Sequence, residues 1–507
     1  MYKTHFFFCL FLVSLLASFF ACDDKYEDYS TNPRDLLSFS NDTVRFDTIL
    51  TTINTPVQFL MVYNRNDQPL LISSVELENG DVSGFKINVD GMAGQHFQNI
   101  AIRPKDSLFV LVDVKPEMNG EVIPTLLNDY IVFKTNGVEQ KVLLEAYGQD
   151  VFIWEGKILS SDTIIENSKP ILIRDSLLIE ENTTLSIKEG TCFYMDNNAR
   201  IIIKGNLKMK GSQEKPITFR GRRTDYMLTV SYDLIPGQWN GFYFHSSSFE
   251  NEMEHVHIRN GKSGLYFEVS TPDEEKLRMR NVVLTNFSEN LLRATNCNIT
   301  AENCEFSNSR FALLELAGGK YSFTHCTMAN YMPSAPDRGW ANSSNETILL
   351  TNVDMDSLFS DNPVYYPLIQ ADFINTIIWG RLVNYGQSAG HSDIKFWHED
   401  NTEFNYFFRN CIIPALNGKN GEHAVDCIFN KDPLFKKTDT TDKETGYFSP
   451  IFDFRLKDIE ETKEQEPSPA INAANPEYSI DLPLDLDGNS RFADEKPDIG
   501  AYESQTN

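Results

Sequence analysis

Basic residues are scarce in this chain of 507 residues, and so are long apolar runs. Lys and Arg number 45 against 72 Asp and Glu, which gives a formal net charge of −27 at pH 7. A chain this acidic repels nucleic acid and anionic lipid headgroups, so the composition argues against nucleic-acid binding and electrostatic membrane attachment. It also disfavours a polyanionic substrate, unless a metal ion or a local basic patch reverses the field. No apolar run after residue 22 is long enough to span a bilayer.

Cysteine is also sparse, and its spacing argues against a metal site. The chain has 8 cysteines, none in a CxxC pair and none with histidines at zinc-finger spacing. Beyond residue 22 they stand at positions 192, 297, 304, 326, 411 and 427. An even number in an exported protein normally indicates disulfides. The repeat pattern of the chain, however, predicts small unpaired core residues.

The N-terminal residues predict a lipoprotein signal peptide over residues 1–21. Lys3 precedes an apolar run from Phe6 to Ala21 that is too short for a transmembrane helix, and Cys22 closes this run. The arrangement resembles the lipobox of bacterial lipoproteins, which implies cleavage before Cys22 and acylation of that residue with chains such as palmitate. Acidic residues directly after the cysteine resemble the surface-export signal of some Gram-negative lipoproteins. The resemblance implies an outer-membrane lipoprotein, exposed at the cell surface and held to the bilayer by lipid; an ordinary secretory signal is the alternative.

The next segments predict a tether and a β-sandwich. Residues 22–38 are polar and charged, as expected of a flexible lipidated tether. Residues 39–150 contain short alternating strands without helical periodicity, and Asn136-Gly137 is a strong type I′ hairpin signal. About seven such strands predict a sandwich. The order VYNRNDQPLLISSVEL, FKI, KPEMNG, KTNG and VLLEAYGQ resembles the abnormal-spindle-like immunoglobulin-like modules of bacterial surface proteins.

From about Val151 onward a short element repeats. It consists of Asn, His or Asp, then Val, Cys or Thr, a variable residue and an apolar residue, and its second positions are 282, 304, 326, 353, 376, 411 and 427. A near-constant period of this size indicates a solenoid, and short strands with Asn-rich corners favour a parallel β-helix. Stacked coils would lie about 4.8 Å apart. We therefore expect one inward column of unbridged residues, comprising Val282, Cys304, Cys326, Val353, Thr376, Cys411 and Cys427.

Two longer stretches carry a family resemblance. LSIKEGTCFYMDNNARIIIKGNLKMKGSQEKPITFRG (185–221) resembles the opening coils of bacterial right-handed parallel β-helix proteins. SPAINAANPEYSIDLPLDLDGNSRFADEKPDIGAYE (468–503) resembles the end of the choice-of-anchor β-helix family. The resemblance implies a pectate-lyase-like solenoid over residues 151–460 and a closing segment over 461–507. The expected fold class is all-β: an immunoglobulin-like β-sandwich followed by a right-handed parallel β-helix.

Catalytic and metal-binding signatures are weak. The fingerprints of β-helix pectate lyases and polygalacturonases are not intact, and Gly390-His391-Ser392 matches only part of one. Carboxylates cluster in two places that could offer oxygens to calcium: Glu250, Glu252 and Glu254, and then Asp481, Asp485, Asp487, Asn489 and Asp498. We favour a solvated row for the first cluster and turn or cap roles for the second. No cofactor is expected, with calcium as the alternative.

The longest spacings between repeats contain the candidate ligand-binding residues. These are Arg338 and Trp340 in one insertion, and His391, Asp393, Trp397 and His398 in the other. Insertions in a repeat fold become loops on one face, often the working face. Tryptophan beside Arg, His and Asp suits a sugar, because an apolar platform combines with polar groups that fix hydroxyls. The alternative is that each tryptophan pins its own loop to the coil.

These observations predict a membrane-anchored extracytoplasmic lipoprotein whose β-helix binds a polysaccharide or another surface without catalysis. Two alternatives stay open: a polysaccharide lyase or glycoside hydrolase, and a structural component of the envelope. A groove with a base, a cation and a close carboxylate pair would favour the enzyme, and aromatic side chains alone would favour binding. The ligand, any partner protein and the oligomeric state are not predicted.

Overall fold

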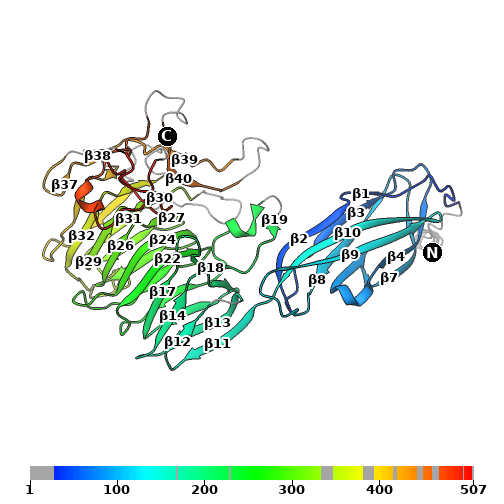
Figure 1. The fold of residues 1–507 in the computed structure, drawn as a ribbon, viewed down its shortest axis with the longest axis horizontal. Helices are drawn as coiled ribbons and strands as arrows, with labels where there is room; N and C mark the ends of the chain where they lie inside the picture. Colours follow the sequence, from blue (N-terminus) through cyan, green and yellow to red (C-terminus); the bar gives the residue numbers. More distant parts are fainter. Residues whose placement is uncertain are drawn as a thin grey trace, which may run out of the picture. The chain divides into compact units, whose positions relative to one another are not determined.

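The computed structural model describes residues 28–166, 169–227, 230–332, 346–380, 393–414, 420–441, 449–458, 467–494 and 496–504. The chain divides into two compact units, Met1–Asp150 and Val151–Asn507. Strands dominate both units (Figure 1), and the described helical segments are the short 3-10 turns η2 (Gly80–Ser83), η3 (Tyr232–Leu234) and η7 (Pro476–Ser479). Within these ranges, no helix is long and apolar enough to cross a membrane.

The first unit is a sandwich of two five-stranded sheets. One sheet has the order β1 (Ser38–Phe39), β3 (Gln58–Tyr63), β8 (Ser107–Val114), β5 (Phe85–Val89) and β6 (Met92–Gly94). The other has the order β2 (Thr43–Leu50), β10 (Val138–Gln149), β9 (Thr125–Thr135), β4 (Leu70–Leu77) and β7 (His96–Ile102). Strand β2 runs parallel to β10, whereas the other strand pairs of both sheets are antiparallel.

Alternation builds the sandwich core. Along β8, Leu108, Val110 and Val112 are buried while the residues between them are not. Their partners in the core come from both sheets, so each strand buries one face against the other sheet. The β9–β10 hairpin turns at Asn136 (φ 52°) and Gly137 (φ 77°). Both residues have positive φ, as a type I′ turn requires, which confirms the predicted hairpin.

The second unit is built on a 26-stranded parallel sheet that wraps into three columns of strands (Figure 1). The first column contains β12 (Thr163–Ile165), β14 (Thr184–Lys188), β17 (Asn206–Lys210), the first halves of β22 (Asn251–Arg259) and β24 (Leu277–Phe287), β26 (Asn298–Glu302), β29 (Gly319–Thr324), β32 (Leu368–Ile374), β35 (Phe407–Arg409) and β37 (Ala424–Val425). The second column starts with the first halves of β11 (Phe152–Leu159) and β13 (Ile171–Ile179), and it includes the second halves of β22 and β24. Its other strands are β15 (Cys192–Met195), β18 (Ile217–Gly221), β27 (Glu305–Ser309), β30 (Thr327–Asn330), β33 (Ile377–Gly380), β36 (Ile412–Ile413) and β38 (Ile428–Phe429).

The third column starts with the second halves of β11 and β13. It continues through β16 (Arg200–Ile203), β21 (Gly241–Phe244), β23 (Leu265–Phe267), β25 (Leu292–Thr295), β28 (Leu314–Ala317), β31 (Ile348–Thr351) and β34 (Ile394–Trp397). Inward side chains of all three columns form one continuous apolar core. The expected fold class is confirmed: an all-β chain with a β-sandwich followed by a parallel β-helix.

The recurrent Asn, His or Asp marks a left-handed corner before the second column. Positive φ values between 48° and 58° occur at His255, Asn281, Asn303, His325, Asn375, Asn410 and Asp426. Short polar side chains tolerate this conformation better than other L-residues. The side chains also hydrogen-bond between coils, with Asn303 Nδ2 donating to Asn281 Oδ1 at 2.6 Å and Asn375 Nδ2 donating to His325 Nε2 at 3.0 Å. The repeat signal is therefore a backbone requirement reinforced by a ladder of polar side chains.

The cysteine column exists, but one predicted member was wrong. Backbone N–H groups of the next strand bond to the carbonyls of Cys304, Cys326, Thr376 and Cys411 in turn, which fixes their order. The four cysteines of the column are free thiols: Cys304, Cys326, Cys411 and, at the end of the column, Cys427. Val353 does not belong here, because it follows β31 of the third column and Asn352 lacks the left-handed conformation. His325 and Asn375 stand at consecutive corners although they are 50 residues apart in sequence. The repeat pattern in the sequence therefore counted one long coil as two.

The C-terminal strap, defined as residues 467–494 and 496–504, packs along the outer face of the second column. Gly500 N bonds to Asn375 O at 2.9 Å, and Gln213 Nε2 bonds to Leu486 O at 3.0 Å. A further apolar core forms between the strap and the outward residues of the column, including Ile377, Trp379 and Ile412. The strap therefore covers a lateral surface across several coils.

Candidate functional site

The structure describes only part of the predicted site. Cys22, Arg338, Trp340 and His391 lie outside the described residues. Asp393, Trp397 and His398 are described, and they lie in or next to β34 at the end of the third column. The observed geometry therefore concerns the second of the two predicted insertions.

Asp393 serves the coil itself. Its side chain is buried, and Thr347 Oγ1 donates to its Oδ1 at 2.8 Å. Its carbonyl accepts the backbone N–H of Ile348 at 2.9 Å. A Cβ at Gly380 would clash with the Asp393 carboxylate, so Gly380 leaves room for this residue. Asp393 thus joins two coils, and the sugar-facing role predicted for it finds no support in these contacts.

Trp397 and His398 are accessible. Trp397 pairs in register with Thr351 of β31, and 38% of its surface is exposed. His398 lies with Nδ1 3.3 Å from Asp400 Oδ1, and its ring stacks on Phe404 with centroids 4.7 Å apart. Both side chains combine an aromatic surface with solvent access, as a binding platform requires.

Five rings next to Trp397 form a continuous aromatic strip, defined as His398, Phe404, Phe396, Tyr406 and His423. Centroids of Phe396 and Tyr406 lie 4.5 Å apart, and Tyr406 stacks on His423 at 4.4 Å. Phe404 packs edge-on against Tyr406 at 5.7 Å. Burial raises the pKa of the Tyr406 hydroxyl, and the nearby Glu422 charge adds to this effect. Tyr406 therefore stays protonated at neutral pH and can donate a hydrogen bond.

The strip exists because β34 is the last described strand of its column. Phe396 occupies the inward position that Leu350 fills in the preceding coil, where Leu350 is fully buried. No described strand stacks over Phe396, and 41% of its surface remains exposed. Four of the five strip residues were missed by the sequence analysis. Two of the four, Phe404 and Tyr406, had a signal in the sequence, because they alternate with Phe408 as residues on one face of a strand do.

The acidic clusters are engaged in local contacts. Glu252 forms an ion pair with Lys208 at 3.0 Å, which lowers the pKa of its carboxyl. Asp485 accepts the backbone N–H groups of Asn489 and Glu503, and Asp498 accepts that of Asn472. Among the described residues, no group of three or more His, Cys, Asp and Glu could hold a metal ion. These hydrogen bonds fit turn and cap roles for the carboxylates of the strap.

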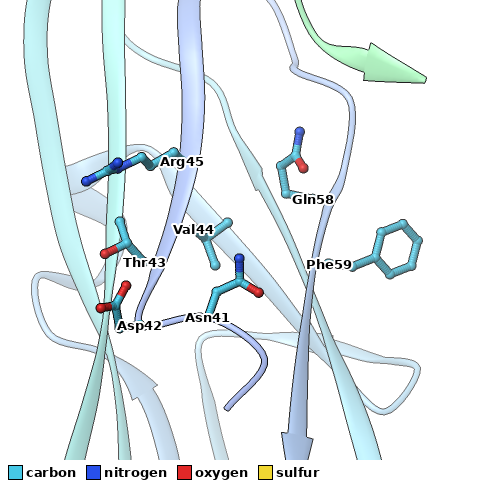
Figure 2. A pocket seen from close by; sticks show the side chains of 7 residues that line it. All are labelled: Asn41, Asp42, Thr43, Val44, Arg45, Gln58 and Phe59. Carbon is cyan, nitrogen blue, oxygen red and sulfur yellow. The ribbon is translucent and has the colours of Figure 1, made fainter. Parts of the chain in front are cut away.

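The sandwich also has a cavity, of about 360 Å3, between β2 and β3. Asn41, Asp42, Thr43, Val44, Arg45, Gln58 and Phe59 line it. Figure 2 shows the Phe59 ring pointing away from the gap between the two strands. Arg45 Nε lies 3.4 Å from Glu145 Oε1 and is thus directed at a neighbouring strand. This cavity does not combine an aromatic wall with polar groups that point into it. The candidate site therefore lies on the β-helix.

No family model matches the chain, and no curated protein matches it. Similarities to solved structures are weak. A family 123 glycoside hydrolase from Clostridium perfringens, studied for glycolipid glycan hydrolysis, is 14% identical over 22% of this chain and 26% of its own, with a TM-score of 0.16. A protein of unknown function from Porphyromonas gingivalis is 13% identical over 25% of this chain and 60% of its own, with a TM-score of 0.17.

One similarity is longer but equally loose. The catalytic domain of a GH87 alpha-1,3-glucanase in complex with nigerose is 10% identical over 71% of this chain and 82% of its own, with a TM-score of 0.14. The chain spans less than two thirds of the length of the two other proteins. Scores this low carry no argument about fold or function, so the geometry of the chain itself has to carry the functional conclusion.

Proposed function

We propose that this chain is an extracytoplasmic lipoprotein that binds glycan on the end of its β-helix, without cleaving it. The observation that carries the proposal is the aromatic strip beside the exposed Trp397. Aromatic faces stack on the apolar faces of sugar rings, while His398, Tyr406 and His423 supply polar atoms for hydroxyl groups. An immunoglobulin-like spacer and membership of the choice-of-anchor β-helix family belong to the same proposal. They rest on the sequence motifs.

The competing interpretation is that the strip only closes the end of the apolar core. Partial burial of Phe404 and Tyr406 against that core is compatible with either role. Trp397 separates the two interpretations because it stands beside the strip on an outward position, paired with Thr351. A platform residue contributes to binding, whereas a residue that closes the core contributes to stability.

The test is Trp397→Ala, with Trp379→Ala as the matched control. Trp379 is 2% exposed and belongs to the core beneath the strap. We expect Trp397→Ala to weaken glycan binding on an array by about 1–2 kcal/mol while the melting temperature stays nearly unchanged. Trp379→Ala should instead cost about 3–5 kcal/mol of stability. Loss of stability with unchanged binding for Trp397→Ala would overturn the proposal. If cleavage products were released from a bound glycan, the protein would be a lyase or hydrolase and not a binding protein.

A further inference from the structure

Two arginine–aspartate–arginine triads lie close together on the first coils of the β-helix. Asp196 lies 3.5 Å from Arg174 Nε and 3.0 Å from Arg222 Nε. Asp233 lies 2.9 Å from Arg220 and 3.0 Å from Arg259. In each triad one carboxylate is shared by two guanidinium groups, so each triad keeps one positive charge in excess. The two triads are linked through the segment from Arg220 to Arg222.

A cavity of about 330 Å3 adjoins this cluster. Its lining includes Asp196, Asn197, Arg222, Arg223 and Gln238. Tyr232 also lines it and directly precedes Asp233 of the second triad. The volume falls at the lower end of the range for small-molecule sites, roughly 300–1,000 Å3. The cavity therefore has room for a ligand of about one sugar residue.

Hydrogen bonds and a ring contact hold the two arginines of the cavity in place. Arg223 makes two bonds to Asp225, of 2.9 and 2.5 Å, and lies 3.6 Å from the centre of the Tyr232 ring. Arg222 bonds to Asp196 through Nε. A guanidinium has five N–H donors in a rigid fork. Toward the described residues, some N–H groups of Arg222 and Arg223 therefore make no hydrogen bond, and both side chains are already fixed, which lowers the entropic cost of binding.

We propose that this cavity binds the acidic group of a charged sugar, a carboxylate or a sulfate. Guanidinium forks recognise such oxyanions through paired, charge-assisted hydrogen bonds. Asn197 and Gln238 offer side-chain amides for neighbouring hydroxyl groups. The sugar part of this inference rests on the proposed glycan-binding function, whereas the anion part rests on the triads and on Arg223.

The net negative charge of the protein favours a ligand with only one acidic sugar unit. The chain carries a net charge of −27, which repels a long polyanion. Screening restricts the field of the triads to roughly 8–10 Å at physiological salt. A single acidic sugar can approach within that range, whereas the following charges of a polyuronate would meet the acidic surface. We therefore expect binding to weaken as the number of charges on the oligosaccharide rises.

The experiment measures binding of galacturonic acid, glucose 6-sulfate and glucose to the full chain in detergent, by calorimetry at millimolar concentrations. Glucose is the neutral probe, and the two acidic probes distinguish carboxylate from sulfate as the source of the charge. We expect at least one of the two acidic sugars to bind, and we expect no binding of glucose. Trigalacturonate should bind more weakly than galacturonic acid, and added salt should weaken binding of the acidic probes.

Variants locate the binding. Arg222→Gln should weaken binding of the acidic sugar about tenfold or more, and Arg222→Lys should restore part of it. Arg278→Gln is the matched control, because Arg278 is an exposed arginine of the same unit whose partner is Glu275. Melting temperatures show whether each variant is folded.

Binding of glucose equal to that of the acidic sugars, absence of binding by either acidic sugar, or equal losses in Arg222→Gln and Arg278→Gln would overturn the proposal. The outcome is independent of the aromatic strip. An acidic sugar that binds normally to Trp397→Ala but not to Arg222→Gln supports this cavity even if the strip binds no glycan.

Discussion

At the scale of single residues, the corners of the β-helix decide both fold and chemistry. His325 stands at a corner where most other coils have Asn or Asp, and its φ is 51°. Its Nε2 accepts hydrogen bonds from Asn375 Nδ2 at 3.0 Å and from Ser479 Oγ at 2.7 Å. Its Nδ1 faces the carbonyl of Gly500 at 3.3 Å, so Nδ1 carries the proton of a neutral ring. Burial, together with the nearby charge of Arg491, lowers the pKa of His325 well below its ordinary value of 6.5.

This histidine predicts a pH dependence of stability. Below the ordinary histidine pKa the unfolded chain binds a proton at His325 that the folded chain does not bind, so folding stability is lost as the pH falls. His325→Asn keeps a residue that favours the corner but removes the titration. We expect the free energy of unfolding of the wild type to fall relative to that of the variant, by up to about 1.4 kcal/mol per pH unit between about pH 6.5 and pH 5. Denaturant titrations at several pH values measure this difference, and parallel pH profiles would contradict it.

At the scale of elements, a buried ion pair attaches the strap to the coils. The Arg491 side chain is fully buried, and its Nη1 donates to Glu503 Oε1 at 2.5 Å. Its Nη2 donates to Asn303 Oδ1, which belongs to the corner ladder. Burial, together with the neighbouring Asp498 charge, raises the pKa of the Glu503 carboxyl, and the positive charge of Arg491 opposes this rise. The pair thus docks the strap onto the coils, because every partner of Arg491 lies in the strap or in the coil beneath it.

Arg491→Gln tests the strap. Removing one partner leaves buried carboxylates without compensation, and we expect a loss of about 3–5 kcal/mol of stability. Arg455→Gln is the matched control, since Arg455 bonds to Asp487 but keeps 48% of its side chain exposed. The control should cost about 0–1 kcal/mol. Urea unfolding of both variants measures the difference, and similar losses in the two would show that the strap pair contributes no more than a surface pair.

The cysteine column gives a second prediction at this scale. Burial raises the pKa of the Cys326 and Cys411 thiols, so little reactive thiolate forms. We expect Cys304, Cys326 and Cys411, which are fully buried, to resist alkylation in the folded protein and to react only after the chain unfolds. Non-reducing mass spectrometry measures both the extent of alkylation and any crosslink. A Cys304–Cys326 disulfide would show that the register of the coils is different.

At the scale of the whole molecule, the net charge of the chain limits how the protein can be attached to a membrane. The chain carries a net charge of −27 and therefore gains nothing from anionic headgroups. The proposed attachment to a membrane therefore relies on acyl chains, each buried CH2 contributing about 0.8 kcal/mol. Lipidation of Cys22, a residue outside the described ranges, would supply such chains.

Cys22→Ala should move the protein from the membrane fraction to the soluble fraction, because the acylated residue is lost. Cys9→Ala is the control within the same N-terminal segment and should leave fractionation unchanged. Detergent-phase partitioning and metabolic labelling with palmitate measure the effect. Unchanged partitioning of Cys22→Ala would contradict the lipoprotein proposal.

Features that depend only on neighbouring residues could be predicted from the sequence. Alternation along strands predicts the β class, and the Asn136-Gly137 turn predicts its hairpin, since both follow from local backbone geometry. The corner residues reveal the coils for the same reason, because the corner backbone is left-handed and Asn281 and Asn303 adopt that conformation at lower cost than most other residues. Regular coils are therefore visible in the sequence, and the long coil was divided in two because Asn352-Val353 imitates the element without the backbone conformation.

Contacts between residues of different coils could not be predicted from the sequence. Arg491 and Asn303 are 188 residues apart in sequence and share a hydrogen bond. The aromatic strip arises because the coil stack leaves Phe396 with no described strand above it, and the arginine triads arise because successive coils place Arg174, Asp196 and Arg222 side by side. Such contacts depend on the number of residues in each coil and on where the strap docks. Those quantities are set by the summed packing of the whole core, and no local pattern in the chain encodes them.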